Sequence, residues 1–264
     1  MVTSTSTAAI GAEGAFPGIR EIELAGLKAW PAHEEARDGS WVRRASGGYS
    51  KRANSVQSID PDDNADAAAR LNDAAHWLID RKLPPVARVT PLAGPGLVEA
   101  LDHAGWETFE PSLVLMADLA TGTYRLDDSV DVSPPAGEAW LTAQQQLQGY
   151  DAHRLWCVKG IVSQMVPPAF GLVLRDEDGT PVASAYVAVV DDFAFLGSVV
   201  TAPAQRRRGL GRRLVQSALA LAMDAGARFS TLQMLRSNTA AFGLYSSLGY
   251  RLRYEYHHRR PVVS

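Results

Sequence analysis

The sequence of 264 residues is 46% hydrophobic and 21% charged, which is ordinary for a soluble globular protein. Its formal net charge of −3 excludes a global field that attracts nucleic acid, so any basic site must be local. Its single cysteine, Cys157, excludes internal disulfides and a zinc site built on paired thiolates.

The N-terminal residues carry no feature of an export signal. Residues 1–19 are mostly small and polar, without a cationic start or an apolar segment, and they are predicted to form a disordered tail. No uninterrupted apolar run approaches the roughly 20 residues that a membrane-spanning helix needs. These features predict a cytoplasmic protein without a membrane partner, and they leave its oligomeric state open.

Residues 20–119 are predicted to form a first α/β domain. A Gly47-Gly48 pair separates two short runs, as in a hairpin, and helices alternate with strands after it. The predicted elements are strands over 40–46 and 49–57, a helix over 65–82, a strand over 86–90, a helix ending near residue 104 and a strand over 106–119.

A polar, proline-containing segment, residues 120–137, is predicted to link this domain to a second one over 138–264. In the second domain, β-branched and aromatic runs flank Asp191-Asp192, which indicates a hairpin. The glutamines at 144–146 are predicted to be solvated helix surface. The predicted elements are a helix over 138–149, strands over 180–190 and 193–201, a helix over 210–225, a strand over 227–235, a helix over 238–248 and a strand over 250–258.

The two domains repeat the same order of elements at a constant spacing. Gly105 and Gly249, which each precede a long strand, are 144 residues apart. The same shift places Ala65 on Gly209, at the start of a helix in each domain. We interpret this agreement as a diverged internal duplication. The alternative is a coincidence of ordinary α/β spacing, because few residues are identical.

An arginine- and glycine-rich stretch, residues 205–214, lies between a strand and a helix of the second domain. The first N–H groups of a helix lack backbone partners and lie at the positive end of its dipole, so they can bind a phosphate. Gly209 and Gly211 remove side chains that would keep a phosphate away, and the arginines add charge-assisted hydrogen bonds. The alternatives are a solvated helix end and a nucleic-acid patch; the acidic balance and the glycines argue against the patch.

Two motifs of the second domain resemble those of the GNAT superfamily of N-acetyltransferases. Residues 206–211, Arg-Arg-Arg-Gly-Leu-Gly, match the R/Q-x-x-G-x-G/A loop that binds the pyrophosphate of acetyl-CoA in that superfamily. Residues 238–250 match its N-x-x-A-x-x-L-Y-x-x-x-G-F/Y signature. The resemblance covers about residues 130–260. It implies an α/β fold of two GNAT-like halves, each a mixed, mostly antiparallel sheet flanked by helices.

The resemblance implies an acetyl-CoA-dependent N-acetyltransferase in which an amine attacks the thioester directly. Tyr245 is the implied acid that protonates the leaving thiolate, and no metal is expected. The candidates for the general base, of which none is assigned, are Asp191, Asp192, Glu255, His257 and a water chain. The residues implied to bind acetyl-CoA are Val199, Val200, Thr201, Arg206, Arg207, Arg208, Gly209, Leu210, Gly211, Arg212, Asn238, Ala241 and Tyr245.

The first half lacks the residues that acetyl-CoA requires. At the 144-residue shift, the acidic segment 62–67 replaces the arginine–glycine loop, and Leu101 replaces Tyr245. This half therefore resembles the degenerate half of two-part GNAT proteins. It either forms one wall of the acceptor pocket or is purely structural, and the residues for such a wall are Trp41, Arg43, Arg52 and Asn54. The alternative function is a non-catalytic acetyl-CoA sensor, since no base is evident.

Overall fold

The computed structural model describes residues 16–166 and 168–262. The tail predicted over 1–19 lies outside these residues except for 16–19, and Ile19 already begins the first helix, α1 (Ile19–Ala29). Within the described residues, no helix has the length and apolar character needed to cross a membrane.

The secondary structure of the first half differs from the predicted one mainly near its N-terminal end. Helix α1 and strand β1 were not predicted, and the tight turn of the hairpin lies at Gly39, which has φ +57, rather than at Gly47-Gly48. A longer segment, residues 46–55, joins β2 to β3. The elements are α1, β1 (Glu34–Asp38), β2 (Trp41–Ala45), β3 (Val56–Ser58), α2 (Ala67–Asp80), β4 (Ala87–Val89), α3 (Pro95–His103) and β5 (Trp106–Asp118).

The second half begins inside the segment that was predicted as a linker. Strand β6 lies within 120–137 and pairs with β7, so these residues contribute to the sheet. Helix α5 and strand β7 were also not predicted. The elements are β6 (Val130–Ser133), α4 (Glu138–Gln148), α5 (Ala152–Val162), β7 (Ala169–Arg175), β8 (Pro181–Val190), β9 (Phe193–Thr201), α6 (Leu210–Asp224), β10 (Phe229–Leu235), α7 (Thr239–Ser246) and β11 (Arg251–Pro261).

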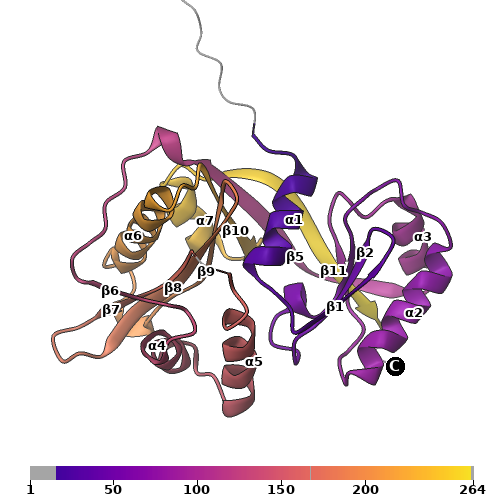
Figure 1. Cartoon of the computed structure of the whole chain (residues 1–264), viewed down its shortest axis with the longest axis horizontal. Helices are drawn as coiled ribbons and strands as arrows, with labels where there is room; N and C mark the ends of the chain where they lie inside the picture. Colours follow the sequence, from indigo (N-terminus) through magenta and orange to yellow (C-terminus); the bar gives the residue numbers. More distant parts are fainter. Residues whose placement is uncertain (1–15, 167, 263–264) are drawn as a thin grey trace, which may run out of the picture.

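The strands of the described residues form one sheet in the order β1-β2-β3-β4-β11-β5-β10-β9-β8-β7-β6. The pairs β3–β4 and β9–β10 are parallel, and the other neighbours in this sheet are antiparallel. Strand β11 of the second half lies between β4 and β5 of the first, and β5 pairs in turn with β10. Each half thus places its last strand in the sheet of the other, and both strands run across the molecule (Figure 1). The predicted fold class is confirmed.

The elements recur at the predicted spacing. Shifted by 144 residues, α2 and α3 fall on α6 and α7, and β5 falls on β11, within a few residues at each end. Gly105 and Gly249, which precede the two long strands, have positive φ angles of +68 and +89. Such angles favour glycine, so the same turn closes the preceding helix in both halves.

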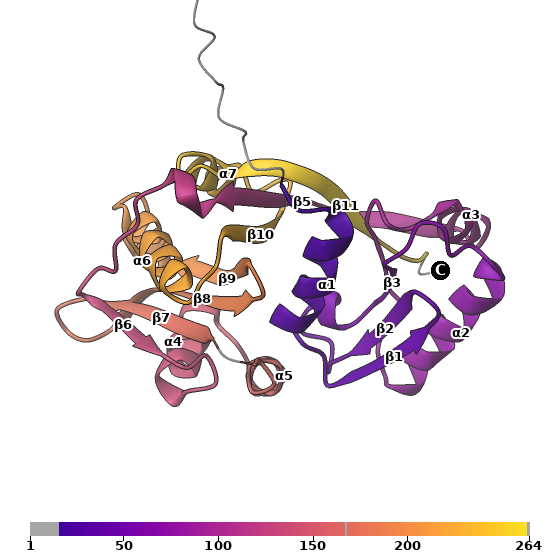
Figure 2. The same ribbon diagram turned by 45° about the horizontal axis from the view of Figure 1, so that its top comes forward.

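Helices cover both faces of the second half's strands. Helix α6 packs on one face, and α4 packs on the other. Helix α1 is the first element of the first half but packs against β8 and β9 of the second half, and it lies between the two halves in Figure 2. The contact is close, because a Cβ added at Gly26 of α1 would lie 3.3 Å from the ring of Phe195. The halves are therefore joined by α1 as well as by the exchanged strands.

A buried ion pair lies where the halves meet. Glu23 of α1 and Arg88 of β4 pair through both carboxylate oxygens, and neither side chain is more than 4% exposed. Tyr254 of β11 donates a hydrogen bond to Glu23, and Arg88 donates to Gln57 and to Gln233 of β10. Burial alone would raise the pKa of Glu23, but the charge and hydrogen bonds of Arg88 lower it overall. The pair thus ties α1 to strands of both halves.

Candidate active site

The arginine–glycine stretch forms the turn between β9 and α6. Gly209 is the N-cap of this 15-residue helix and has φ +79, and Arg207 also has a positive φ, +63. Arg213, one turn into the helix, pairs with Asp127 at 2.7 Å. The remaining arginines, which take part in no ion pair among the described residues, are Arg206, Arg207, Arg208 and Arg212. The helix start therefore combines free N–H groups with uncompensated positive charge.

Three elements meet beside this helix start. A Cβ added at Gly211 of α6 would lie 3.4 Å from Cδ2 of Leu244 on α7 and 3.7 Å from Oγ1 of Thr201 on β9. The Nε of Arg206 also donates to the carbonyl of Thr201 at 3.4 Å. The residues predicted from the two motifs and from the end of β9 are thus neighbours.

Strands β9 and β10 separate midway along their length. Their parallel pairing runs from Phe193 and Phe229 to Leu196 and Leu232, whereas β10 continues to Leu235 along β5. Ser198, with φ +50, lies in a bulge of β9 just beyond the last pair. On the side of β10, residues 197–201 therefore have no strand partner within the described sheet. The main-chain groups of this stretch that bond neither to β8 nor to a side chain are available to an extended ligand.

Gln144 of α4 holds this bulge. Its Nε2 donates to the carbonyl of Ser198 at 2.9 Å and to Oγ of Ser184 at 3.1 Å, and its side chain is fully buried. The prediction of solvated surface over 144–146 is therefore wrong for Gln144. The buried Nε2 satisfies a carbonyl that the bulge removes from strand pairing, whereas Oε1 of Gln144 has no hydrogen-bond partner among the described residues.

Helix α7 carries Tyr245 toward the core of the second half. The side chain of Tyr245 is 7% exposed and packs edge-on against Tyr250, with 5.7 Å between ring centroids. Burial raises the pKa of Tyr245 to about 12, so its hydroxyl stays protonated at neutral pH and can donate a proton. Asn238 is the N-cap of the helix, because its Oδ1 accepts a hydrogen bond from the N–H of Ala241 at 3.1 Å.

A groove of about 320 Å³ lies between the two halves, next to the point where β9 and β10 separate. Of the four first-half residues predicted to form a wall, Arg52 lines it. Trp41 and Asn54 are instead buried within the first half, and Arg43 pairs with Asp38 at 2.9 Å. The groove is lined by Trp30, Tyr49, Ser50, Lys51, Arg52, Glu110, Ser112, Ser198, Gln233, Met234, Leu235, Tyr256 and His258.

None of the four candidate bases lines this groove. Asp191 and Asp192 lie in the turn before β9, at the end of that strand opposite the bulge, and each pairs with a basic side chain. Glu255 pairs with Arg236, and His257 lies on β11 outside the groove. Among the described residues, no three His, Cys, Asp or Glu side chains are placed to hold a metal ion.

The groove contains a carboxylate and an imidazole that were not predicted for the site, those of Glu110 on β5 and His258 on β11. Oε1 of Glu110 lies 2.9 Å from Nζ of Lys51, and its Oε2 lies 3.8 Å from Nδ1 of His258. Burial, together with the positive charges of Arg88, Lys51 and Arg52, lowers the pKa of His258 to about 3, so the ring is neutral. No local motif marks these residues, because the pairing of β5 with β11 brings them together.

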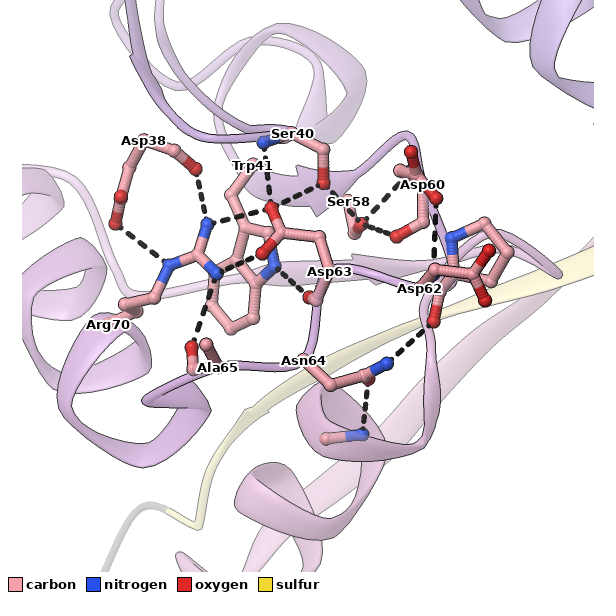
Figure 3. Close-up of polar contacts among 12 residues, drawn as sticks. Asp38, Ser40, Trp41, Ser58, Asp60, Asp62, Asp63, Asn64, Ala65 and Arg70 are labelled. Carbon is pink, nitrogen blue, oxygen red and sulfur yellow. Dashed lines mark hydrogen bonds and ion pairs between the residues drawn. The ribbon is translucent and has the colours of Figure 1, made fainter.

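The corresponding loop of the first half is occupied by its own side chains (Figure 3). Asp63 accepts hydrogen bonds from Arg70 at 2.7 Å and from the N–H and hydroxyl of Ser40 at 2.8 and 2.7 Å. The Arg70 hydrogen bond is the largest cause that holds the pKa of Asp63 well below its usual range. Asn64 accepts from the N–H of Gly96 at 2.7 Å, and Leu101 is fully buried. These contacts leave an acidic, internally bonded loop at the start of α2.

The family described as "Probable histone acetyltransferase Rv0428c C-terminal" matches residues 17–262 of this chain. Among curated relatives, "Uncharacterized N-acetyltransferase YobR" of Bacillus subtilis (strain 168) is 27% identical over 247 residues. That match covers 91% of this chain and 98% of the relative. The sequence similarity thus extends over both halves.

Solved structures support the fold. A GCN5-related N-acetyltransferase from Kribbella flavida superposes with a TM-score of 0.70 at 20% identity, over 93% of this chain and 96% of that one. A tandem GNAT protein from the clavulanic acid biosynthesis pathway gives 0.64 at 14% identity, over 92% and 88%. The predicted GNAT resemblance and two-part organisation are confirmed. The chain therefore belongs to the Rv0428c acetyltransferase C-terminal family and is an acetyltransferase of GNAT type.

Proposed function

We propose that the protein transfers an acetyl group from acetyl-CoA to a primary amine and that the second half alone binds the cofactor. The observation that carries this proposal is the start of α6, where Gly209 and four arginines lie beside the gap between β9 and β10. None of these four arginines pairs with a carboxylate among the residues that the structure describes. A diphosphate fits such donors and charges. The residues proposed to bind it and the pantetheine arm are those predicted from the sequence, at 199–201, 206–212, 238, 241 and 245.

In this function acetyl-CoA supplies the activated acetyl group. The protein orients the pantetheine arm and donates a proton to the leaving sulfur. The unpaired edge of β9 orients the arm, and the bulge at Ser198, held by Gln144, sets where that edge begins. Tyr245 supplies the proton that the departing sulfur needs, because its raised pKa keeps the hydroxyl protonated. A sensor without turnover is less well supported, since the groove holds a carboxylate, Glu110, that can act on an amine.

Replacing Tyr245 with phenylalanine is expected to slow turnover by roughly 10²-fold or more while leaving the Kd for acetyl-CoA within about twofold. The ring still fills the core beside Tyr250, so only the proton donor is lost. Thiol release in the presence of an accepted amine measures turnover, and calorimetry measures the Kd. Tyr250→Phe serves as the control because that hydroxyl bonds Ser230, inside the core. Unchanged turnover in Tyr245→Phe would remove Tyr245 as the acid.

The loop at the start of α2 is filled by its own side chains, so the first half is not expected to bind acetyl-CoA. Calorimetric titration is expected to give one acetyl-CoA per chain, and Asp63→Asn is expected to leave both stoichiometry and affinity unchanged. The variant weakens the partly exposed contact with Arg70, so its stability falls by only about 1 kcal/mol. Two sites per chain would show that the first half binds the cofactor, and no binding would refute the proposed function.

A further inference from the structure

Glu110 has an unusual backbone conformation for a residue inside a strand. Its φ of +49 lies in the left-handed region that non-glycine residues rarely adopt, next to an irregularity in the pairing of β5 with β11. The hydroxyl of Ser112 donates to the carbonyl of Glu110 at 2.9 Å, which supports the distorted backbone. Such strain persists where the surrounding structure requires one particular placement of a side chain. Here the outcome is a carboxylate that lines the groove.

Two side chains from distant parts of the sequence flank this carboxylate. Nζ of Lys51, in the segment between β2 and β3, lies 2.9 Å from one oxygen of Glu110. Nδ1 of His258, on β11, lies 3.8 Å from the other oxygen. His258 is 3% exposed, and within the described residues neither of its ring nitrogens has a hydrogen-bond partner. A buried polar group without a partner is costly, so its retention calls for an explanation. At 3.8 Å the ring does not hydrogen-bond to Glu110, but because it is neutral it adds no positive charge that would compete with an ammonium group for the carboxylate.

The rest of the groove combines aromatic rings with basic side chains. Trp30, Tyr49 and Tyr256 line it, but Arg52 lies over the ring of Trp30 at 5.4 Å and Arg88 over that of Tyr256 at 4.2 Å. Among the lining residues, Glu110 is therefore the group that can attract an ammonium. Ser198 and residues 233–235 line both the groove and the gap between β9 and β10. An ammonium held at Glu110 therefore lies in the same groove that opens on the proposed position of the thioester.

We infer that Glu110 binds the ammonium group of the acceptor and accepts its proton, with Lys51 and His258 as positioning residues. The first half then supplies the acceptor side of the active site, although it lacks a cofactor loop of its own. The substrate class is a primary amine that enters in its protonated form. This inference rests on the proposed function, because it requires the thioester to lie in the gap between β9 and β10.

The proton balance is complete without a further reactant. The ammonium gives one proton to the Glu110 carboxylate, which releases it to solvent. The amine nitrogen then forms a bond to the thioester carbon, and as the carbon–sulfur bond breaks the nitrogen loses its second proton by the same route. The sulfur takes a proton from the Tyr245 hydroxyl, which regains one from solvent. The net products are an amide, a thiol and one proton.

The test compares Glu110→Gln and Glu110→Asp with Glu107→Gln in the full-length protein. Glu107 lies on the same strand and pairs with Arg260 at 2.8 Å, but it does not line the groove. Thiol release is measured with acetyl-CoA and a panel of glycine, ethanolamine, spermidine, glucosamine and a lysine tripeptide. Calorimetry gives the Kd for acetyl-CoA, and thermal unfolding checks the fold.

Glu110→Gln is expected to lower kcat/KM for the amine by about 10²- to 10⁴-fold, with the Kd for acetyl-CoA within about twofold of the wild type. Glu110→Asp is expected to restore part of this loss, and Glu107→Gln to behave as the wild type. His258→Asn, which keeps an N–H donor, is expected to retain more activity than His258→Leu at similar Tm. A difference in activity between these two variants at similar Tm shows that the side chain at 258 positions Glu110. A purely packing role would change the Tm instead.

Two results would overturn the inference while leaving cofactor binding intact. One is a Glu110→Gln variant with the kcat/KM of the wild type. The other is a wild-type protein that binds acetyl-CoA but whose thiol release no amine in the panel increases. Failure of the wild type to bind acetyl-CoA is a different result, because it refutes the proposed function together with this inference.

Discussion

Replacing Arg88 with methionine is expected to lower the free energy of unfolding by about 3–5 kcal/mol. The substitution leaves the Glu23 carboxylate in a site where it is 4% exposed, with no positive partner. The hydrogen bonds from Tyr254 and Gln57 cannot replace a full charge. Urea denaturation measures the change. Replacing both partners, as in Glu23→Leu with Arg88→Met, is expected to recover more than half of the loss, because apolar residues leave no buried charge.

The Arg88→Met substitution is also expected to change how the free energy of unfolding depends on pH. In the wild type the pKa of Glu23 lies below its ordinary value of 4.5, so the contribution of the pair is complete above that value and is lost as the pH falls through the lowered pKa. In Arg88→Met the unpaired, buried carboxyl has a raised pKa, so acidification from neutral pH relieves its cost. The stability difference between the two proteins therefore narrows between pH 7 and about pH 5.

Arg228→Met provides the matched control for the ion pair. Arg228 pairs with Asp192 at 3.2 Å, but both side chains are more than half exposed. Its replacement is expected to cost less than about 1 kcal/mol and to show no such narrowing with pH. Equal losses in Arg88→Met and Arg228→Met would contradict the role assigned to the buried pair.

Replacing Gly209 with aspartate is expected to weaken acetyl-CoA binding by more than about a hundredfold. The carboxylate would lie over the N–H groups at the start of α6 and repel a diphosphate there. Loss of two charge-assisted hydrogen bonds alone corresponds to about 3 kcal/mol or more, which is over two decades in Kd. Calorimetric titration of acetyl-CoA measures the change.

Two controls separate charge from backbone strain in this experiment. Gly209→Asn has the same size and tolerates a positive φ, so it is expected to bind more tightly than the aspartate variant. Gly179→Asp introduces the same residue at φ +78, against +79 for Gly209, and both positions open into empty space. Since Gly179 lies in the β7–β8 turn, its variant is expected to bind as the wild type does. A Gly209→Asp variant with unchanged affinity would remove this helix start as the phosphate site.

The parts of the candidate site that lie within one short segment could be predicted from the sequence. Gly209, Gly211 and Asn238 each act through the backbone of the helix that they begin, and their meaning follows from helix geometry. Gly105 and Gly249 revealed the duplication for the same reason, because a positive φ before a strand restricts the residue type. The order of helices and strands in the second half followed from these fixed points.

The remaining residues could not be predicted, because they depend on contacts between distant segments. The pairing of β5 with β11 brings Glu110 close to His258. Nothing in the local sequence around either residue indicates that the two side chains are close together. In the sequence, Gln144 is an ordinary polar residue of a helix. Its role depends on the bulge at Ser198, whose carbonyl accepts its hydrogen bond. Helix α1 escaped prediction because the polar Glu23 interrupts its apolar stripe, although Arg88 makes that residue a buried one.

The exchange of strands also has a consequence for how the chain is made. Strand β11 begins 133 residues after β5 ends, yet it fills the position between β4 and β5. During translation the first half therefore emerges with both of these strand edges unpaired, and it stays so until the second half has left the ribosome. The first half can therefore reach its final strand order only after residues 251–261 have been made, so the two halves do not reach their final fold as independent domains.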